Sequence, residues 1–567
     1  MTARQRLSSF RPLRYRLLAS LLWLLFSAPA FAQAIDALRD TLQNEANTNA
    51  EAERARRDAA RARAERASDL PSAESGSAPA EGGPCFTIRE IRITGHEPFG
   101  KPPSGHEQLI GTCATAADIA RALGRINAFY QEEGFITTRA YLPEQDVSDG
   151  SLEISVIPGR IEGYAYGDGR QADRRLAAAF PAARGDLLNL REIEQGLDNF
   201  NAPRSASAKF QLVPGQTVGG SFVQVLSEDE RRFQANLSTE NTGFKSTGVY
   251  KGNATVGIDN LIGINDQLSF SLSSTPFDPR GRRYSDALSV SALVPYGNWS
   301  LGLDAGTSRY AFTLDGINQA YPVSGRSQHV SLTLERLISR DSISKLHAYG
   351  GLKFSRSLSF IDSYEIQSQR QRLAIGSLGL RGETFAGAGK FGFDATARFG
   401  IEALGSEVPA KSAVDPDFKN WTLRLTSEQP LGSSPLTYKG VIAAQLASDI
   451  LPASEQFSIG GWSSVRGFHD DNMYGASGIY FRNTLEWLAF SRPGLEARLG
   501  AGLDVGWLKP SPLRQWDQRH LIGVSLSADV IIRQRMFMAF VLAHALDRPS
   551  DFDAARTIGF ASLDVRF

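Results

Sequence analysis

Apolar and polar residues alternate along most of the second half of the chain. In the segment DQLSFSLSS, Leu268, Phe270 and Leu272 fall on one face and serines fall on the other. The segment KFGFDATARFGIEA repeats this arrangement, with phenylalanine and alanine set against charged or polar residues. A period of two residues is typical of a β-strand with one apolar and one polar face. About sixteen such segments of roughly ten residues follow residue 228, and they predict a transmembrane β-barrel of about 16 antiparallel strands over residues 229–567.

Soluble β-sandwiches also contain alternating strands, so the pattern alone leaves that alternative open. The chain end TIGFASLDVRF favours the barrel, because its last apolar residues alternate strictly with polar ones up to Phe567. A final aromatic side chain is unfavourable in water. In bacterial outer-membrane barrels a terminal phenylalanine that closes the last strand is ordinary. We therefore expect Phe567 to close the barrel.

The N-terminal segment has the pattern of an export signal. Five arginines precede or begin an apolar run from Leu17 to Phe26, and the small residues Ala30 and Ala32 follow it. This order predicts a signal peptide over residues 1–32, cleaved before Gln33. The apolar run is shorter than the roughly 20 residues of a membrane-spanning helix, which argues against an uncleaved anchor. The mature protein is therefore expected outside the cytoplasm.

Residues 33–67 are almost all strong helix formers. After Leu42 they are mainly arginine, glutamate and alanine, so the predicted helix has no apolar face long enough to be buried in a core or in lipid. Such a helix can lie in water or inside a polar channel. Residues 68–84 are rich in serine, proline and glycine and predict a flexible linker.

Two small α+β domains are expected between the linker and the barrel, over residues 85–158 and 159–228. The first combines alternating strands with a helix whose apolar residues Ile119, Leu123, Ile126 and Tyr130 have helical spacing. The second repeats the order of elements in a shorter form. Cys85 and Cys113 are the two cysteines of the chain. An even number in an exported protein predicts a disulfide, and two thiols without nearby histidines cannot complete a tetrahedral zinc site.

Charge and composition exclude several classes of function. Removal of the signal peptide leaves 56 basic and 61 acidic residues, so we expect no nucleic-acid partner. The seven histidines are scattered, and no nucleophile has a base at a recognisable spacing, which argues against an enzyme and against a cofactor. An ATP-binding Walker sequence is also absent.

Several segments, in their order and spacing, resemble the two-partner secretion transporters. These are outer-membrane barrels that export filamentous haemagglutinins, haemolysins and contact-dependent inhibition toxins. The resemblance covers nearly the whole mature chain and rests on CFTIREIRITG, NLREIEQGLDNFNAPRSASAKFQLVPG, TGVYKGNATVGIDNLIGINDQLSF and GGWSSVRGFHDDNMYGASGIYFRNTLEW. It implies two periplasmic POTRA domains, a barrel of about sixteen strands and an N-terminal helix that can sit in the pore.

The resemblance also implies a latch inside the barrel. In that family a Val-Arg-Gly-Phe motif lies at the tip of a long loop that folds back into the lumen and faces an F-x-D-x-G motif on the wall. The loop motif is matched here by Val465, Arg466, Gly467 and Phe468. Asp504 and Gly506 match the wall motif, but Gly502 stands where the family has phenylalanine. We expect Arg466 to pair with Asp504, because a guanidinium can bind a carboxylate with two parallel hydrogen bonds, and Gly467 to permit a tight turn.

The function implied by the resemblance is a pore that moves an unfolded partner protein of the TpsA type to the cell surface without ATP. The partner would add a strand to a POTRA sheet. Candidate contacts are Tyr130, Gln145 and Asp146, although Tyr130 also fits a core position. Further expected partners are outer-membrane lipid and the machinery that assembles outer-membrane barrels, and the protein is expected to be a monomer. The alternatives are an assembly insertase of the same superfamily, which usually has more POTRA domains, and a passive solute porin, in which the POTRA-like region and the loop motif have no role.

Overall fold

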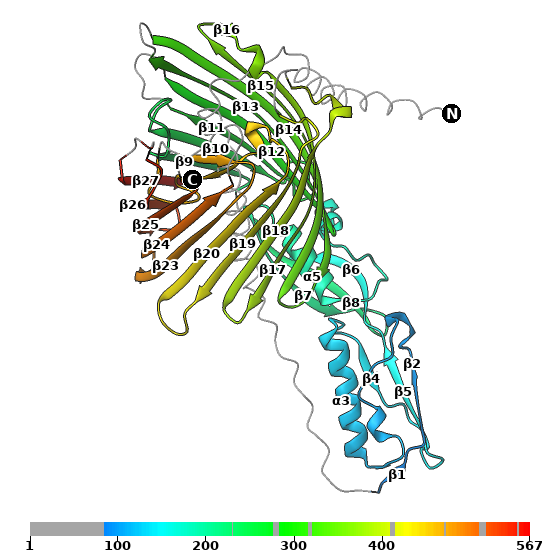
Figure 1. Cartoon of the computed structure of the whole chain (residues 1–567). Coiled ribbons are helices and arrows are strands. Elements are labelled where there is room, and N and C mark those ends of the chain that lie inside the picture. The colour runs from blue at the N-terminus through cyan, green and yellow to red at the C-terminus, as the bar shows by residue number, and fades with distance from the viewer. Residues whose placement is uncertain are drawn as a thin grey trace, which may run out of the picture.

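The computed structural model describes residues 84–567 except 230, 276–282, 316–319, 409–413, 470–471, 510–517, 551 and 553–554. The predicted signal peptide, the predicted helix 33–67 and linker residues 68–83 lie outside the described residues. Two small α+β domains precede a closed barrel (Figure 1). None of the helices in the described ranges is long and apolar enough to cross a membrane.

The barrel consists of sixteen antiparallel strands, as the alternating pattern predicts. Their bounds are β9 (Phe233–Glu240), β10 (Lys251–Asp259), β11 (Gln267–Ser274), β12 (Tyr284–Tyr296), β13 (Trp299–Asp315), β14 (Ala320–Arg340), β15 (Ser344–Ile361), β17 (Gln371–Ala386), β18 (Gly389–Gly400), β19 (Lys419–Pro430), β20 (Leu436–Ala447), β23 (Gly478–Arg492), β24 (Leu495–Leu508), β25 (His520–Ile532), β26 (Met536–Asp547) and β27 (Thr557–Arg566). A short segment, β16 (Tyr364–Glu365), pairs with the end of β15. The barrel closes between β27 and β9, where the backbone N–H of Phe567 donates to the carbonyl of Ala235 over 2.9 Å.

Alternation assigns each strand an outer and an inner face. Leu332 and Leu334 of β14 are exposed on the outside, as a lipid-facing surface requires. Glu335 follows Leu334 directly in sequence and faces the lumen, where Arg381 donates to its carboxylate. His347 lies 3.2 Å from the same carboxylate. The lumen is therefore lined by polar side chains that bond to one another.

The first α+β domain has a three-stranded sheet in the order β2-β5-β4, a small β1-β3 pair and one long helix. The bounds are β1 (Phe86–Thr87), β2 (Glu90–Thr94), β3 (Cys113–Ala114), α3 (Ala116–Glu132), β4 (Arg139–Tyr141) and β5 (Ser151–Ile157), with short 3-10 helices η1 (Glu97–Phe99) and η2 (Glu107–Leu109). Helix α3 begins after Thr115, whose hydroxyl accepts from the N–H of Asp118 while the Asp118 carboxylate accepts from the N–H of Thr115. Cys85 and Cys113 form a disulfide, which confirms the expected pairing.

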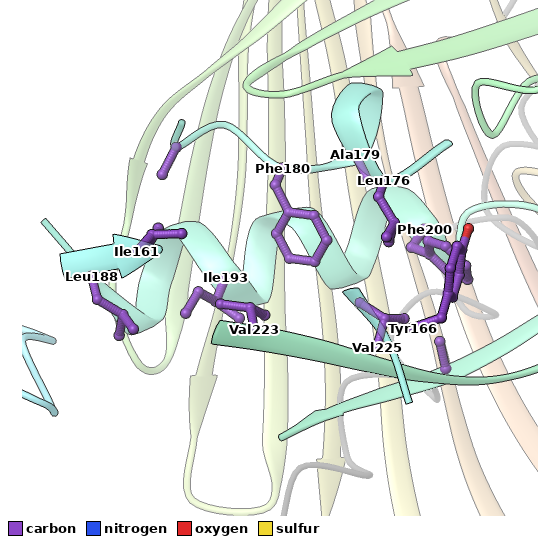
Figure 2. Close-up of a cluster of buried hydrophobic side chains, with 12 residues drawn as sticks. Ile161, Tyr166, Leu176, Ala179, Phe180, Leu188, Ile193, Phe200, Val223 and Val225 are labelled. Carbon is purple, nitrogen blue, oxygen red and sulfur yellow. The ribbon is translucent and has the colours of Figure 1, made fainter. Parts of the chain in front are cut away.

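The second α+β domain has a sheet in the order β6-β8-β7, covered by two helices. The bounds are β6 (Arg160–Tyr166), α4 (Arg174–Ala179), α5 (Leu190–Phe200), β7 (Ala206–Pro214) and β8 (Gly220–Asp229). Its core joins Ile193 and Phe200 of α5 to Val223 and Val225 of β8, and all four side chains are buried (Figure 2). Helical spacing on α5 and alternation on β8 thus bring the two apolar faces together.

An ion-pair cluster holds the second domain against one end of the barrel. The carboxylate of Asp198 on α5 lies 2.5 Å from Arg340 at the end of β14 and 2.7 Å from Lys345 at the start of β15. Arg340 also lies 3.2 Å from Glu194, one turn earlier on α5. We call Glu194, Asp198, Arg340 and Lys345 the domain anchor.

Hydrogen bonds to two further turns of the barrel add to this interface. Asn199 donates from its side-chain amide to the carbonyl of Gly297 over 2.6 Å, between β12 and β13. Arg175 of α4 donates to the side-chain oxygen of Asn265 over 2.8 Å, between β10 and β11. The second domain is therefore fixed to three consecutive turns at this end of the barrel.

Candidate functional site

The described residues of the connection between β20 and β23, 448–469 and 472–477, fold into the lumen. It contains a small hairpin of β21 (Phe457–Ile459) and β22 (Met473–Gly475). Gln445, which faces inward on β20, donates from its side-chain amide to the carbonyls of Glu455 and Ala476. The carboxylate of Glu455 lies 3.7 Å from Lys353, another lumen-facing residue. Both ends of the hairpin are thus bonded to the inner wall.

Arg466, at the tip of this loop, lies against Asp504 of β24. The guanidinium donates twice, from Nε to Oδ2 over 2.6 Å and from Nη2 to Oδ1 over 2.7 Å. The backbone N–H of Arg466 donates to Oδ2 as well, over 3.1 Å. Arg466 is 2% exposed and Asp504 is completely buried. The structure therefore brings together the two residues that the family resemblance singled out. Their two parallel hydrogen bonds are buried.

The backbone of β23 takes part in the same network. Nη2 of Arg466 donates to the carbonyl of Asn483 over 2.7 Å, and the N–H of Asn483 donates to Asp504 Oδ1 over 3.2 Å. Asp504 consequently accepts from four N–H groups. The pair connects the loop to two strands of the wall rather than to one.

Gly467 and Phe468 complete the tip of the loop. The φ angle of Gly467 is +112°, and a side chain there would meet the backbone of His544 and Ala545 within about 3 Å. Phe468 is 2% exposed, and its ring centroid lies 6.1 Å from that of Phe552. The larger apolar cluster under the loop comprises Ala443, Ile459, Val465, Phe468, Met473, Tyr480, Leu508, Leu521, Ala545 and Phe552.

Two glycines of β24 leave room for the loop. A Cβ atom at Gly502 would lie 2.3 Å from Nη2 of Arg466, so the guanidinium occupies the space beside this residue. A Cβ atom at Gly506 would lie 2.8 Å from a methyl group of Val465. The departure at position 502 therefore has a local consequence, because the wall has no side chain there and the arginine packs directly on the backbone.

Sequence reasoning missed Asn483, Gln445 and Arg482. Arg482 is paired with Asp504 in the β23–β24 register and donates to the carbonyl of Ser463 over 3.4 Å. Its inward position could have been inferred from the alternation of β23. The contribution of Asn483 comes from its main chain, which no sequence motif marks.

The comparisons with known proteins agree with this architecture. A family model described as "Haemolysin secretion/activation protein ShlB/FhaC/HecB" matches residues 219–530. Models of a ShlB-type POTRA domain and of a POTRA domain match residues 86–159 and 160–214. The chain belongs to the haemolysin secretion/activation family.

Relatives of this chain are named as transporters. The outer membrane transporter CdiB of Dickeya dadantii (strain 3937) is 33% identical over 434 residues, which is 75% of this chain and 77% of that protein. The hemolysin transporter protein ShlB of Serratia marcescens is 29% identical over 402 residues, or 70% of this chain and 71% of that protein. Like them, this member is an outer-membrane transporter, with its POTRA domains in the periplasm.

Solved structures share the fold. CdiB from Escherichia coli superimposes with a TM-score of 0.84 at 24% identity and covers 94% of this chain and 100% of its own. CdiB from Acinetobacter baumannii gives a TM-score of 0.74 at 22% identity and covers 98% of this chain and 97% of its own.

The candidate partner contacts on the first POTRA domain lie in different environments. Tyr130 is completely buried beside Phe99, and burial raises its pKa to about 12. It is therefore a core residue, as the alternative interpretation of the sequence had it. Gln145 lies in the lining of a surface cavity of about 560 Å³ between α3, the end of β4 and the start of β1. Asp146 accepts from the N–H of Ser148 over 2.9 Å, and this bond lowers the pKa of its carboxyl group.

Proposed function

We propose that this protein conducts an unfolded secreted protein of the TpsA type through the barrel, and that the loop with Arg466 at its tip controls the passage. The observation that carries this proposal is the buried Arg466–Asp504 pair, which bonds a long loop to the inner wall of a polar lumen. A passive solute pore has no need of such a fastening. The names of the transporter relatives support the same function.

The POTRA domains would capture the partner at a sheet edge, where main-chain hydrogen bonds provide affinity with little demand on sequence. The edge strands β4 and β7 each carry an asparagine clamp. Asn127 donates to and accepts from the backbone of Ala140 on β4, and Asn201 does the same with Ala208 on β7. These side-chain amides occupy the positions that a neighbouring strand would use.

Strand β7 has a longer free edge than β4. It contains nine residues, and within the described part of the chain it pairs with β8 alone. Past the clamp at Ala208, the next edge positions are Phe210 and Leu212. We place the added strand of the partner there. The cavity beside Gln145 is the candidate for an apolar side chain of the same partner, because Phe86 and Leu142 in its lining are partly exposed.

The test is export by the variant Arg466→Ala. Cells would carry the transporter and a TpsA-type protein from the same genome, and surface-exposed partner would be measured. Export should fall at least about tenfold, because removal of one member of a buried pair costs about 3–5 kcal/mol and leaves the Asp504 carboxylate uncompensated. Heat-modifiable gel mobility would verify that the barrel has assembled.

Arg492→Ala is the matched control, since this arginine ends β23 at the opposite end of the strand from the loop contacts. The control should export normally. Normal export by Arg466→Ala in an assembled barrel would refute the proposed role of the loop. We also propose that the protein is a monomer and that the barrel-assembly machinery inserts it into the membrane. Cross-linking in membranes tests both points.

A further inference from the structure

An asparagine lies on the lipid-facing side of β23, among large apolar residues. Ile479, Phe481, Leu485 and Trp487 are exposed on this side of the strand, because alternate side chains of a strand point the same way. Asn483 occupies the middle position of the same series. A side-chain amide is costly in lipid unless its hydrogen-bonding groups have partners. Its presence there therefore calls for a structural reason.

A tyrosine of the neighbouring strand provides one of these partners. The hydroxyl of Tyr438 on β20 donates to Oδ1 of Asn483 over 2.7 Å, and Nδ2 of Asn483 donates to the carbonyl of Leu503 on β24 over 2.9 Å. The residue directly opposite Asn483 on β20 is Gly440. A Cβ atom there would lie 2.7 Å from the Tyr438 hydroxyl, so the glycine leaves room for the ring to reach Asn483 diagonally. We call Tyr438, Gly440 and Asn483 the wall brace.

The main chain of the same asparagine bonds to the ion pair that fastens the loop. The carbonyl of Asn483 accepts from Nη2 of Arg466 over 2.7 Å, and its N–H donates to Oδ1 of Asp504 over 3.2 Å. Nη2 of Arg466 also donates to Oδ1 of Asp504 over 2.7 Å. The guanidinium, the carboxylate and the main-chain groups of Asn483 thus form a closed ring of hydrogen bonds. A shift of the Asn483 backbone would lengthen two of them.

The side-chain bonds of Asn483 restrict such a shift. One end of the amide is bonded to β20 and the other to β24, which are the two strands that flank β23. Water does not compete for these bonds on a lipid-facing surface, and hydrogen bonds are electrostatically stronger at low dielectric constant. Because β20 also leads into the loop, the brace ties the strand where the loop starts to the wall that receives its tip.

We propose that the wall brace positions the fastening of the loop from the lipid side of the wall. Tyr438 and the side chain of Asn483 hold the main-chain groups of Asn483 where Arg466 and Asp504 bond to them. Both residues of the side-chain bond are positioning residues that act through the backbone of β23. The importance of the brace for export rests on the proposed function of the loop. The attachment of the loop itself can be measured without a partner protein.

The test uses the full-length protein in phosphatidylcholine nanodiscs with the reporter substitution Ser464→Cys. Ser464 lies beside the tip of the loop and is 4% exposed, and the two natural cysteines are joined in a disulfide. The rate of labelling by a maleimide therefore reports how often the loop leaves its site. The double variant Tyr438→Phe/Asn483→Leu replaces both side chains of the bond by apolar ones. Labelling should become about fivefold faster, the equivalent of one lost hydrogen bond.

Two further measurements separate positioning from a general effect on the barrel. The temperature at which heat-modifiable mobility is lost should not fall, because both new side chains suit a lipid-facing surface. The double variant should also add no further acceleration in an Arg466→Ala background, where the bond that it positions is already missing. Thr307→Leu is the matched control, since this residue is an exposed polar residue of β13, which pairs with β12 and β14. It should leave the labelling rate unchanged.

Unchanged labelling of the double variant in an assembled barrel would overturn the proposal, and so would equal acceleration with and without Arg466. Gly440→Ala provides a second variant if the double variant does not assemble. Its Cβ atom should displace the Tyr438 hydroxyl and accelerate labelling in the same direction, and an unchanged rate would again overturn the proposal. Faster labelling together with normal export by Arg466→Ala would refute only the proposed function of the loop and leave the brace in place.

Discussion

The domain anchor provides a sharp test of how the second POTRA domain is held. Asp198→Asn keeps the size of the side chain and removes its charge. The variant leaves Arg340 and Lys345 without the carboxylate that lies 2.5 Å and 2.7 Å from them. The hydrogen bonds from Asn199 to Gly297 and from Arg175 to Asn265 remain. The second POTRA domain should therefore stay attached to the barrel, but its interface with the barrel should open more often.

The size of the effect follows from burial. Removal of one partner from a buried ion pair costs about 3–5 kcal/mol, and an exposed pair is worth less than about 1 kcal/mol. The side chains of Asp198 and Arg340 are 22% and 9% exposed, so the anchor is close to the buried case but still partly wet. We expect a loss of about 3 kcal/mol, which raises the open population by roughly a hundredfold.

Hydrogen exchange measures this opening directly. The N–H of Gly297 in the barrel donates to the carbonyl of Ala178 in α4 over 2.9 Å, so its protection reports the interface. In Asp198→Asn, peptides containing Gly297 should exchange about a hundredfold faster. The N–H of Leu431, which closes the β19–β20 turn over 2.9 Å, should keep its rate. Unchanged protection of Gly297 would refute the argument that the ion pairs fix the domain.

The pH dependence has a defined sign. Burial alone would raise the pKa of Asp198, but Lys345 and Arg340 outweigh it and lower the pKa below its ordinary value of 3.8. A lowered pKa means that the stabilisation is fully present above 3.8 and is lost as pH falls through the lower folded value. Gly297 protection should therefore be constant from about pH 8 to 5 after correction for intrinsic exchange. Glu192→Gln serves as the control, because Glu192 lies on the same helix and its pKa is raised by burial and then by Asp186.

Three further predictions concern other parts of the chain. Gly506→Trp should expel the loop, because a Cβ atom there already lies 2.8 Å from a methyl group of Val465, and added protease should then cleave the loop between β20 and β23 in intact cells but leave it uncut in the unaltered protein. Replacement of Cys85 and Cys113 by serine should lower the stability of the first POTRA domain by on the order of 3 kcal/mol, so that proteolysis of that domain begins at a lower denaturant concentration. Proteolysis at the same denaturant concentration would show that the loop closure does not stabilise the domain. Deletion of residues 33–67 should raise single-channel conductance in planar bilayers if the predicted helix occupies the pore, whereas equal conductance would favour a solvated segment.

The barrel could be predicted from the sequence because alternation has a single physical solution in a membrane. Each strand that faces lipid must present apolar residues at every second position, and only closure satisfies the backbone of the last strand. The prediction of sixteen strands is confirmed. The family resemblance is confirmed as well, and it directed attention to Arg466 and Asp504, which are 38 residues apart and belong to different elements.

Other features depended on the register between strands, which the sequence does not state. The domain anchor is one of these features, since Asp198 meets Arg340 only after both domains have formed. Tyr130 is a different case. Helical spacing identified the apolar face of α3 on which it lies, but the spacing could not decide whether a partner or the sheet of the same domain covers that face.

The Arg466–Asp504 pair and the domain anchor differ in how tightly they can hold. The Arg466–Asp504 pair has side-chain exposures of 3% and 0% and rests on an apolar cluster, whereas the Arg340–Asp198 pair has exposures of 9% and 22%. Water reaches the second pair more easily, which weakens its charge interaction and lowers the cost of separating its members. Withdrawal of the loop must also expose Val465 and Phe468, which adds an apolar cost that the domain anchor lacks. The POTRA interface should therefore open at lower free energy than the loop, so that movement at the periplasmic end can occur while the lumen is still closed.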